Sequence, residues 1–399
     1  MIGDTTPGSS RLLETAALSP DEEAALLRSG LVDTFGRVHT YLRLSLTERC
    51  NLRCTYCMPA DGVELSPPAQ LLTTDEIERL AAVFARMGAT KVRLTGGEPT
   101  VRSDVVEICE RIANIPGIKS VGMTTNGVAL LKRRSAASSR TLLEDLYAAG
   151  LRSVNVSLDA VDPETFARMT RRPAKTLDRV LDAIKTASDA STFPELKVKV
   201  NCVVMRGAND HLLVDFVRHF LDTYDPAAAA PLDVRFIEWM PFQENAWNDE
   251  ALVSAAEIAD RLAGGGIGLR PLPADDPHDT TRWFAATRDR RSTTVGEDPQ
   301  NETSSFLRVG VISSMTNHFC GGCNRVRVTA DGALKTCLFG DDAVSLRDVL
   351  RAGGGDVDVA RAVATALGKK HFAHGGKTGG AQGIARAADA NRPMILIGG

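Results

Sequence analysis

Three cysteines within a span of eight residues are the strongest chemical signal in this sequence. Cys50, Cys54 and Cys57 form a C-x3-C-x2-C pattern directly after an apolar segment. Three thiolates on one loop can hold three irons of a [4Fe–4S] cluster, and the fourth iron is then open to a small molecule. A structural zinc site normally needs a fourth ligand, and no further Cys or His lies within this loop. The pattern therefore favours an iron–sulfur cluster over a zinc knuckle.

A second group of three cysteines lies in the last quarter of the chain. Cys320, Cys323 and Cys337 form a C-x2-C-x13-C pattern, again with three thiolates. A zinc site completed by His318 is the main alternative that this spacing leaves open. The presence of two separate triplets in one chain favours a second [4Fe–4S] cluster over zinc. With three thiolate ligands, such a cluster would keep one open iron that can bind a substrate directly. We therefore expect two clusters.

Basic residues next to the second triplet indicate an anionic ligand. Arg325 and Arg327 alternate with Val326 in a β-rich segment, so on a strand both guanidinium groups would project from one face. Paired guanidinium groups suit phosphate oxygens, although a solvated basic face is the alternative. Four more basic residues lie in or at the edge of predicted strands, namely Arg43, Arg93, Lys199 and Arg235. We expect these cations to face one cavity and to bind a polyanion such as a triphosphate.

Composition narrows the class of protein. The chain has 399 residues, 43% of them hydrophobic, and a formal net charge of −3, which argues against a protein that coats nucleic acid. The first twenty residues lack the apolar core of a secretory signal, and no later run approaches a membrane span. We therefore expect a cytoplasmic protein. In a reducing compartment, clustered cysteines are better explained as metal ligands than as disulfides.

The elements that must position these residues alternate between strands and helices. Six short β-branched or apolar runs are predicted as strands: Tyr41–Leu46, Lys91–Thr95, Ser120–Thr124, Ser153–Leu158, Lys197–Val204 and Val234–Ile237. Helical segments such as Thr74–Met87 and Leu142–Ala149 lie between them. This alternation predicts parallel βαβ units in a doubly wound sheet or a barrel. The first triplet follows a strand end, where barrel folds carry their chemistry, and this favours the barrel.

The chain divides into four predicted parts. They are an N-terminal extension, a partial barrel, a region that carries the second triplet, and a C-terminal helical segment with a Gly-Gly tail, at residues 1–37, 38–240, 241–345 and 346–399. Beyond the barrel we predict a second short β region at Leu307–Ile312, Val326–Thr329 and Ala333–Cys337. The polar stretch Arg288–Ser305 is predicted to be a disordered insertion. Residues 131–140 are predicted to be a solvated basic loop, with a docking loop as the alternative.

The first triplet and its surroundings resemble the radical S-adenosylmethionine superfamily. The superfamily signature has an aromatic residue before the third cysteine, and Tyr56 fills that place; Gly96 and Gly97 begin a GGEP motif after the second predicted strand. The resemblance implies that the open iron chelates S-adenosylmethionine and that the reduced cluster yields a 5′-deoxyadenosyl radical. It also implies a set of residues that line the cosubstrate, namely Tyr56, Gly97, Ser157 and Met240.

The combination of both triplets with the basic residues closely resembles the GTP 3′,8-cyclase family. The resemblance spans roughly residues 38–345 and the last two residues. It implies an α/β fold, an incomplete (β/α)6 TIM-type barrel closed by a C-terminal region with a small β element and the second cluster. It also implies that the radical removes hydrogen from C3′ of GTP and that the ribose then attacks C8 of guanine. The product would be 3′,8-cyclo-7,8-dihydro-GTP, in the first step of molybdenum cofactor biosynthesis.

The same resemblance implies the remaining contacts and partners. The residues that would hold GTP are Arg43, Arg93, Thr124, Lys199, Arg235, Arg325, Val326 and Arg327, and the second cluster would bind the purine. The tail Gly398–Gly399 would reach into the active site. Apart from this tail, catalysis is expected to depend on the two clusters and the 5′-deoxyadenosyl radical and on no catalytic side chain. Expected partners are an electron donor such as flavodoxin or ferredoxin and the pyranopterin-forming enzyme that takes the product. We expect a monomer or homodimer that contacts neither nucleic acid nor membrane.

Two other functions are compatible with parts of the pattern. A radical enzyme that modifies a peptide would use downstream clusters for electron transfer, but it would need more downstream cysteines than these three and does not explain the arginine pair. A non-catalytic metal or RNA-binding module would use both triplets as zinc knuckles. That module needs aromatic stacking positions, and the chain is only 5% aromatic.

Overall fold

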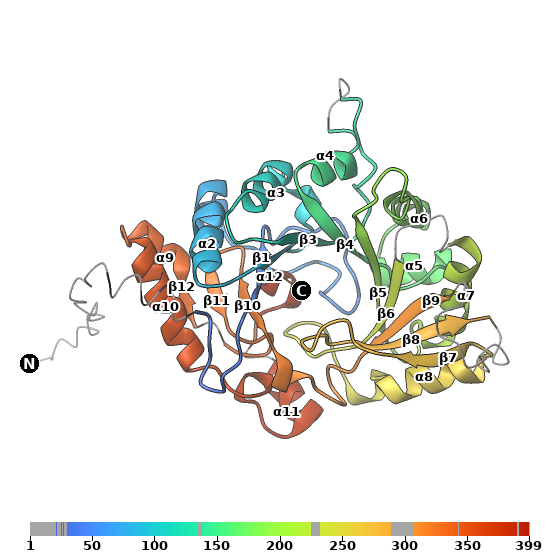
Figure 1. Cartoon of the computed structure of the whole chain (residues 1–399). Coiled ribbons are helices and arrows are strands. Elements are labelled where there is room, and N and C mark those ends of the chain that lie inside the picture. The colour runs from blue at the N-terminus through green and yellow to red at the C-terminus, as the bar shows by residue number, and fades with distance from the viewer. Residues whose placement is uncertain are drawn as a thin grey trace, which may run out of the picture.

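The fold is built on one large sheet. The computed structural model describes Asp21, Ala25 and Leu27 and residues 30–134, 138–224, 232–288, 306–341, 343–388 and 391–398. Within these residues a 12-stranded sheet runs in the order β12-β11-β10-β1-β2-β3-β4-β5-β6-β9-β8-β7. The sheet curves around an interior into which the C-terminus reaches (Figure 1). This is an α/β fold with a mostly parallel sheet.

Six neighbouring parallel strands form the middle of the sheet. They are β1 (Tyr41–Ser45), β2 (Lys91–Thr95), β3 (Ser120–Thr125), β4 (Leu151–Ser157), β5 (Lys197–Val204) and β6 (Leu232–Glu238). Consecutive strands pair in parallel, as the predicted βαβ alternation requires. All six predicted strands are confirmed, with ends that differ by at most two residues.

Helices connect these strands and cover their outer face. The connecting helices are α2 (Thr74–Arg86), α3 (Val105–Ala113), α4 (Leu142–Ala148), α5 (Pro163–Thr170), α6 (Thr176–Ala187) and α7 (Leu213–Thr223). Two of them begin with a capping box, in which Thr73 pairs with Glu76 and Thr141 with Glu144. Their apolar faces pack against the sheet; α2 contacts β1 and α4 contacts β4. Both predicted helices are confirmed.

The C-terminal strands extend both edges of the same sheet. They are β7 (Gly268–Leu272), β8 (Arg282–Thr287), β9 (Leu307–Ile312), β10 (Arg325–Val328), β11 (Ala333–Lys335) and β12 (Val344–Ser345). Strand β9 pairs in parallel with β6, and β10 pairs in parallel with β1. The three strands predicted in this region are confirmed as β9, β10 and β11, with ends that differ by at most two residues, and they belong to the same sheet as the central strands. The edges of six parallel strands leave unpaired backbone groups, and β9 and β10 satisfy them.

Further helices follow β6 along the chain. They are α8 (Ala255–Gly264), α9 (Leu346–Arg351), α10 (Asp356–Gly368), α11 (Gly380–Arg386) and α12 (Met394–Ile397). Helix α8 packs against β7 and β9, α9 packs against β11, and α12 lies in the interior (Figure 1). Short 3-10 turns occur at Pro68–Gln70, Pro99–Val101, Asp210–Leu212, Asp249–Ala251, Cys320–Gly322 and His374–Gly376. None of the helices in the described part of the chain has the length and apolar character needed to span a membrane. Much of the insertion at Arg288–Ser305 lies outside the described residues.

Alternation along the strands separates the core from the interior. In β1, Leu42 and Leu44 are almost fully buried against the helices, whereas Tyr41 and Arg43 line an interior cavity. The same alternation in β5 buries Val198 and directs Lys199 inward. The apolar core thus lies between the sheet and its helices, and the inner face of the sheet is left for polar side chains.

Candidate active site

One cavity brings the two cysteine triplets together. It has a volume of about 1350 Å³ and lies on the inner face of the sheet. Its lining includes all six predicted cluster ligands, namely Cys50, Cys54, Cys57, Cys320, Cys323 and Cys337. The sequence separates the triplets by more than 260 residues, and the pairing of β10 with β1 is what places them around the same space.

The first triplet lies on the loop that follows β1. This loop packs against the GGEP turn after β2, where a Cβ atom on Gly97 would lie 2.4 Å from the carbonyl oxygen of Arg49. Gly97 N–H lies 2.7 Å from the carbonyl oxygen of Thr47 and Glu98 N–H 2.8 Å from that of Arg49. Gly97 is therefore required for close packing of two backbone segments. This contact holds the cysteine loop in place.

His318 lies in a compact group of possible metal ligands. Within the described part of the chain, one ligand atom each of His318, Cys320 and His374 lie within 4.8 Å of one another. This group is a candidate zinc site that shares Cys320 with the second triplet. A [4Fe–4S] cluster would instead take the three thiolates of Cys320, Cys323 and Cys337.

The two triplets differ in their electrostatic surroundings. Burial raises the pKa of Cys57 to about 12, and the neighbouring Cys50 and Asp159 add to this shift. Burial also acts on Cys323, but the positive charges of Lys370 and Arg325 outweigh it and lower the pKa of that thiol. Negative charge therefore acts on Cys57 of the first triplet and positive charge on Cys323 of the second. Metal binding to the first triplet must release protons, since its thiols are neutral without metal.

The four residues predicted to line S-adenosylmethionine all line the cavity. They are Tyr56, Gly97, Ser157 and Met240. The carbonyl oxygen of Tyr56 accepts hydrogen bonds from Asn245 Nδ2 at 3.2 Å and Trp239 Nε1 at 3.4 Å, so the peptide between two cysteines is anchored. Asp159 lies near Tyr56, and burial raises the pKa of its carboxyl group to about 7. Sequence reasoning missed Asp159, which stands two residues after Ser157.

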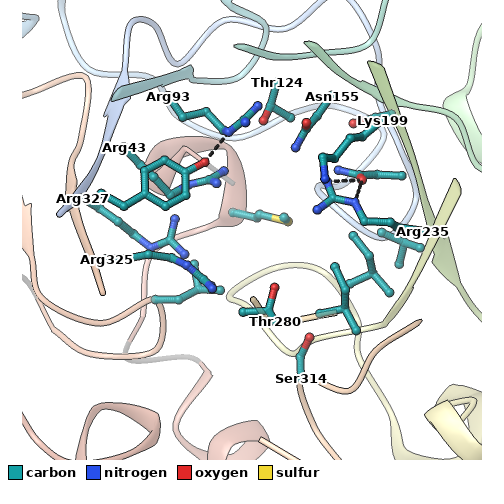
Figure 2. Close-up of a pocket in the computed structure, with 18 of the residues that line it drawn as sticks. Arg43, Arg93, Thr124, Asn155, Lys199, Arg235, Thr280, Ser314, Arg325 and Arg327 are labelled. Atoms are coloured by element: carbon teal, nitrogen blue, oxygen red, sulfur yellow. Dashed lines mark hydrogen bonds between the residues drawn. The ribbon is translucent and has the colours of Figure 1, made fainter. Parts of the chain in front are cut away.

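The residues predicted to hold GTP also face the cavity, with one exception. The lining includes Arg43, Arg93, Thr124, Lys199, Arg235, Arg325 and Arg327. Figure 2 shows them on opposite walls, with Arg43, Arg325 and Arg327 on one side and Lys199 and Arg235 on the other. The side chain of Val326 is fully buried in the apolar core and points away from the cavity. Alternation along β10 requires this, because its two arginine neighbours face inward.

Several of these cations already have protein partners. Arg93 donates hydrogen bonds to the Tyr41 hydroxyl, to Met123 O at 3.0 Å and to Ser153 Oγ at 3.1 Å. Lys199 Nζ lies 2.8 Å from Asp233 Oδ2. In Arg235, Nε and Nη2 both donate to Asn201 Oδ1, at 3.0 and 2.7 Å (Figure 2). These side chains are thus held in defined positions before any ligand arrives.

Other polar atoms in the cavity have no partner. Arg43 Nε, Arg327 Nη1, Thr124 Oγ1 and Asn155 Oδ1 are buried and make no hydrogen bond within the described part of the chain. Burial lowers the pKa of Arg43, and the positive charge of Arg327 lowers it further. A guanidinium group stays protonated in proteins, so this repulsion persists until an anion relieves it. Unpartnered buried groups of this kind are the ones that a ligand would satisfy.

Asn155 is a cavity residue that sequence reasoning missed. It lies on β4 between Thr124 of β3 and Lys199 of β5, with which it is in register. A signal was present, because Asn155 stands two residues before Ser157 and must share its face of the strand. Tyr41 was missed in the same way, two residues before Arg43.

The end of the chain reaches the inner face of the sheet. Thr95 Oγ1 lies 3.4 Å from the carbonyl oxygen of Gly398, and helix α12 packs beside Phe242, Met315 and Phe339. Gly398 has a φ of 79°, and a Cβ atom there would lie 2.7 Å from Ser45 Cβ and from Thr95 Oγ1. Only glycine fits this position without displacing its neighbours. Gly399 lies outside the described residues.

Comparison with known proteins agrees with this arrangement. Residues 44–220 match the model of the radical SAM superfamily, and residues 232–375 match the model described as Molybdenum Cofactor Synthesis C. A mitochondrial GTP 3′,8-cyclase of Arabidopsis thaliana is 45% identical over 92% of this chain and 83% of its own length. A GTP 3′,8-cyclase of Rhodopirellula baltica is 38% identical over 86% of this chain and 87% of its own. Molybdenum cofactor biosynthesis protein 1 of Mus musculus is 45% identical, and the matched region spans 52% of that longer protein.

Proposed function

This chain belongs to the GTP 3′,8-cyclase family of the radical S-adenosylmethionine superfamily, and on that basis we propose that it converts GTP to 3′,8-cyclo-7,8-dihydro-GTP in molybdenum cofactor biosynthesis. The observation that carries the proposal is the single cavity lined by both cysteine triplets and by the basic residues. A substrate in this cavity can contact both cluster sites at once. We further propose that β1 to β6 form an incomplete (β/α)6 barrel.

The first triplet is the proposed site of the cluster that binds S-adenosylmethionine. When bound, this cluster supplies the electron that cleaves the cosubstrate to a 5′-deoxyadenosyl radical. Gly97 lets the GGEP turn pack directly on the cysteine loop, and the anchored carbonyl of Tyr56 fixes the peptide between two ligands. Ser157 and Met240 line the same region of the cavity. The three thiols are half-buried and line the cavity, so a cluster held there can contact a cosubstrate inside it.

The triphosphate of GTP is proposed to bind the cationic inner face of the strands. Arg43 and Arg327 have buried N–H groups without partners, so they gain most from phosphate oxygens. Arg93, Lys199 and Arg235 keep their protein partners and contribute positive charge from fixed positions. Val326 is limited to a contact through its backbone, because its side chain lies in the core.

The nucleoside part of GTP is proposed to lie between the two triplets. Thr124 Oγ1 and Asn155 Oδ1 are neutral and unpartnered, so they suit the hydroxyl groups of a ribose better than a phosphate. The second cluster, at Cys320, Cys323 and Cys337, is proposed to bind the purine. The tail is proposed to complete the cavity wall, since Met394 and Ile395 line the cavity and Gly398 lies next to Ser45 and Thr95. An electron carrier such as flavodoxin or ferredoxin is the proposed reductant, and the pyranopterin-forming enzyme the proposed recipient of the product.

An anaerobic assay tests this proposal. The reconstituted and reduced protein is incubated with S-adenosylmethionine and GTP, and 5′-deoxyadenosine and the GTP-derived product are measured by mass spectrometry. We expect both products, with formation of deoxyadenosine stimulated by GTP. Deoxyadenosine without a GTP-derived product would contradict the assigned substrate. Neither product, from protein shown to hold both clusters, would contradict the radical chemistry itself.

A further inference from the structure

A buried lysine lies beside the second cysteine triplet. Lys370 is 5% exposed, and its Nζ lies 3.6 Å from Cys323 Sγ and 3.3 Å from the carbonyl oxygen of Arg325. In the described part of the chain, no carboxylate forms an ion pair with this ammonium group. A buried ammonium group is costly unless an anion balances it. The anion nearest to Lys370 is therefore the thiolate of Cys323 and whatever that thiolate binds.

An N-terminal strap, defined here as residues 31–39, holds this lysine in place. Arg37 Nη1 donates to Cys320 O at 2.7 Å and to Phe372 O at 2.6 Å, so one guanidinium group joins the cysteine loop to the segment after Lys370. Asp33 orients that guanidinium group through a 2.6 Å contact with Arg37 Nε. The ammonium group and the cysteine loop are thus fixed relative to each other from two sides.

The first triplet has no equivalent of this lysine. The donors around its sulfur atoms are uncharged: Leu52 N–H lies 3.4 Å from Cys50 Sγ, and the Tyr56 hydroxyl hydrogen-bonds with Cys54. Among the described residues, no side-chain cation donates a hydrogen bond to Cys50, Cys54 or Cys57. The charges that face Cys54 and Cys57 include the carboxyl group of Asp159. The second site therefore has an ammonium group within hydrogen-bond distance of a ligand sulfur, whereas the first has none among the described residues.

This difference has a consequence for electron transfer. Reduction adds negative charge to an iron–sulfur cluster, so a nearby cation and an N–H···S hydrogen bond stabilise the reduced form and raise the reduction potential. We propose that Lys370 is a tuning residue that raises the reduction potential of the second cluster above that of the first. An electron that can reduce either cluster then resides preferentially on the second cluster, which is the one proposed to bind the substrate. The inference rests on the second cluster of the proposed function, but not on GTP as the substrate.

Redox titration of the second cluster alone tests this proposal. Cys50, Cys54 and Cys57 are changed to Ala in the full-length chain, so the signal comes from the second site. Iron and sulfide are counted, and the midpoint potential is measured by electron paramagnetic resonance. In that background, Lys370→Met is expected to lower the ratio of reduced to oxidised cluster about tenfold at a fixed potential, which is about 59 mV for one electron. Lys370→Arg, which keeps charge and donor, is expected to restore most of the shift.

Two further variants separate tuning from a structural effect. Lys369→Met removes a neighbouring exposed lysine and is expected to leave the potential unchanged. Lys370→Gln keeps an N–H donor but loses the charge, so it is expected to give a smaller downward shift and serves if the Met variant loses its cluster. An unchanged midpoint potential in cluster-bearing Lys370→Met or Lys370→Gln protein would overturn the proposal. Absence of iron and sulfide from the triple-Ala protein would show that the second triplet holds no cluster, and it would overturn the proposal whatever the activity assay shows.

Discussion

The tail offers the sharpest test of the proposed active site, through the substitution Gly398→Ala. Gly398 has a φ of 79°, a conformation that costs an L-residue about 1–2 kcal/mol. Its new Cβ atom would also lie 2.7 Å from Ser45 Cβ and from Thr95 Oγ1, and overpacking of this kind costs about 1–3 kcal/mol. The two effects together disfavour the docked tail by about 2–5 kcal/mol, which is roughly 30-fold or more in the ratio of docked to undocked tail.

We expect this substitution to reduce formation of the cyclised GTP product at least tenfold. The assay is the anaerobic incubation with S-adenosylmethionine and GTP, with 5′-deoxyadenosine and cyclised product counted separately. Iron content and thermal unfolding should stay close to those of the parent, because the atoms nearest to the added Cβ belong to Ser45 and Thr95 and not to a cluster ligand. Deletion of Gly398 and Gly399 should have the same effect on the product.

Gly353→Ala is a matched control for the backbone cost. Gly353 has a φ of 87° and nothing within 4 Å of an added Cβ atom, so this variant carries the same conformational penalty far from the cavity. It should lose some stability and keep full turnover per folded molecule. Undiminished cyclisation by the Gly398→Ala variant would refute the docked-tail argument, as would an equal loss in the Gly353→Ala variant.

Three more predictions follow from the site. Cys54→Ala should abolish formation of 5′-deoxyadenosine, since the radical has no source; detectable cleavage at the parent rate would contradict the first cluster. Cys323→Ala should leave some uncoupled cleavage and stop cyclisation, whereas equal loss of both would make the second cluster merely structural. Burial alone would raise the pKa of Tyr41, but the cations Arg93, Arg43 and Lys91 lower it from 10.0 to about 7. The KM for GTP should therefore rise above pH 7, because the phenolate cancels positive charge, and Tyr41→Phe should flatten that rise in a steady-state pH series. The contribution of the Tyr41 phenolate to folding stability should be absent below pH 7 and complete above pH 10.

The sequence alone was enough to predict the central strands and the two triplets. Both signals are local: the strands show as short apolar runs between helical segments, and Cys50, Cys54 and Cys57 lie on one loop. Inward-facing side chains such as Arg43 and Lys199 also follow from strand alternation alone. A resemblance to a known family supplied the roles of these residues, and the comparisons support that family.

The pairing of distant segments was decided only by the tertiary structure. The local sequence of Arg325–Val328 does not indicate that this strand pairs with β1, because any exposed strand edge can accept a parallel partner. The partners of Lys199 and Arg235 depend likewise on the pairing of β5 with β6. The seat of Gly398 between Ser45 and Thr95 and the position of Lys370 against Cys323 depend on contacts between still more distant segments. Spacing in the sequence determines which groups can do chemistry, whereas contacts between residues hundreds of positions apart determine their distances, their charges and the cavity that they share.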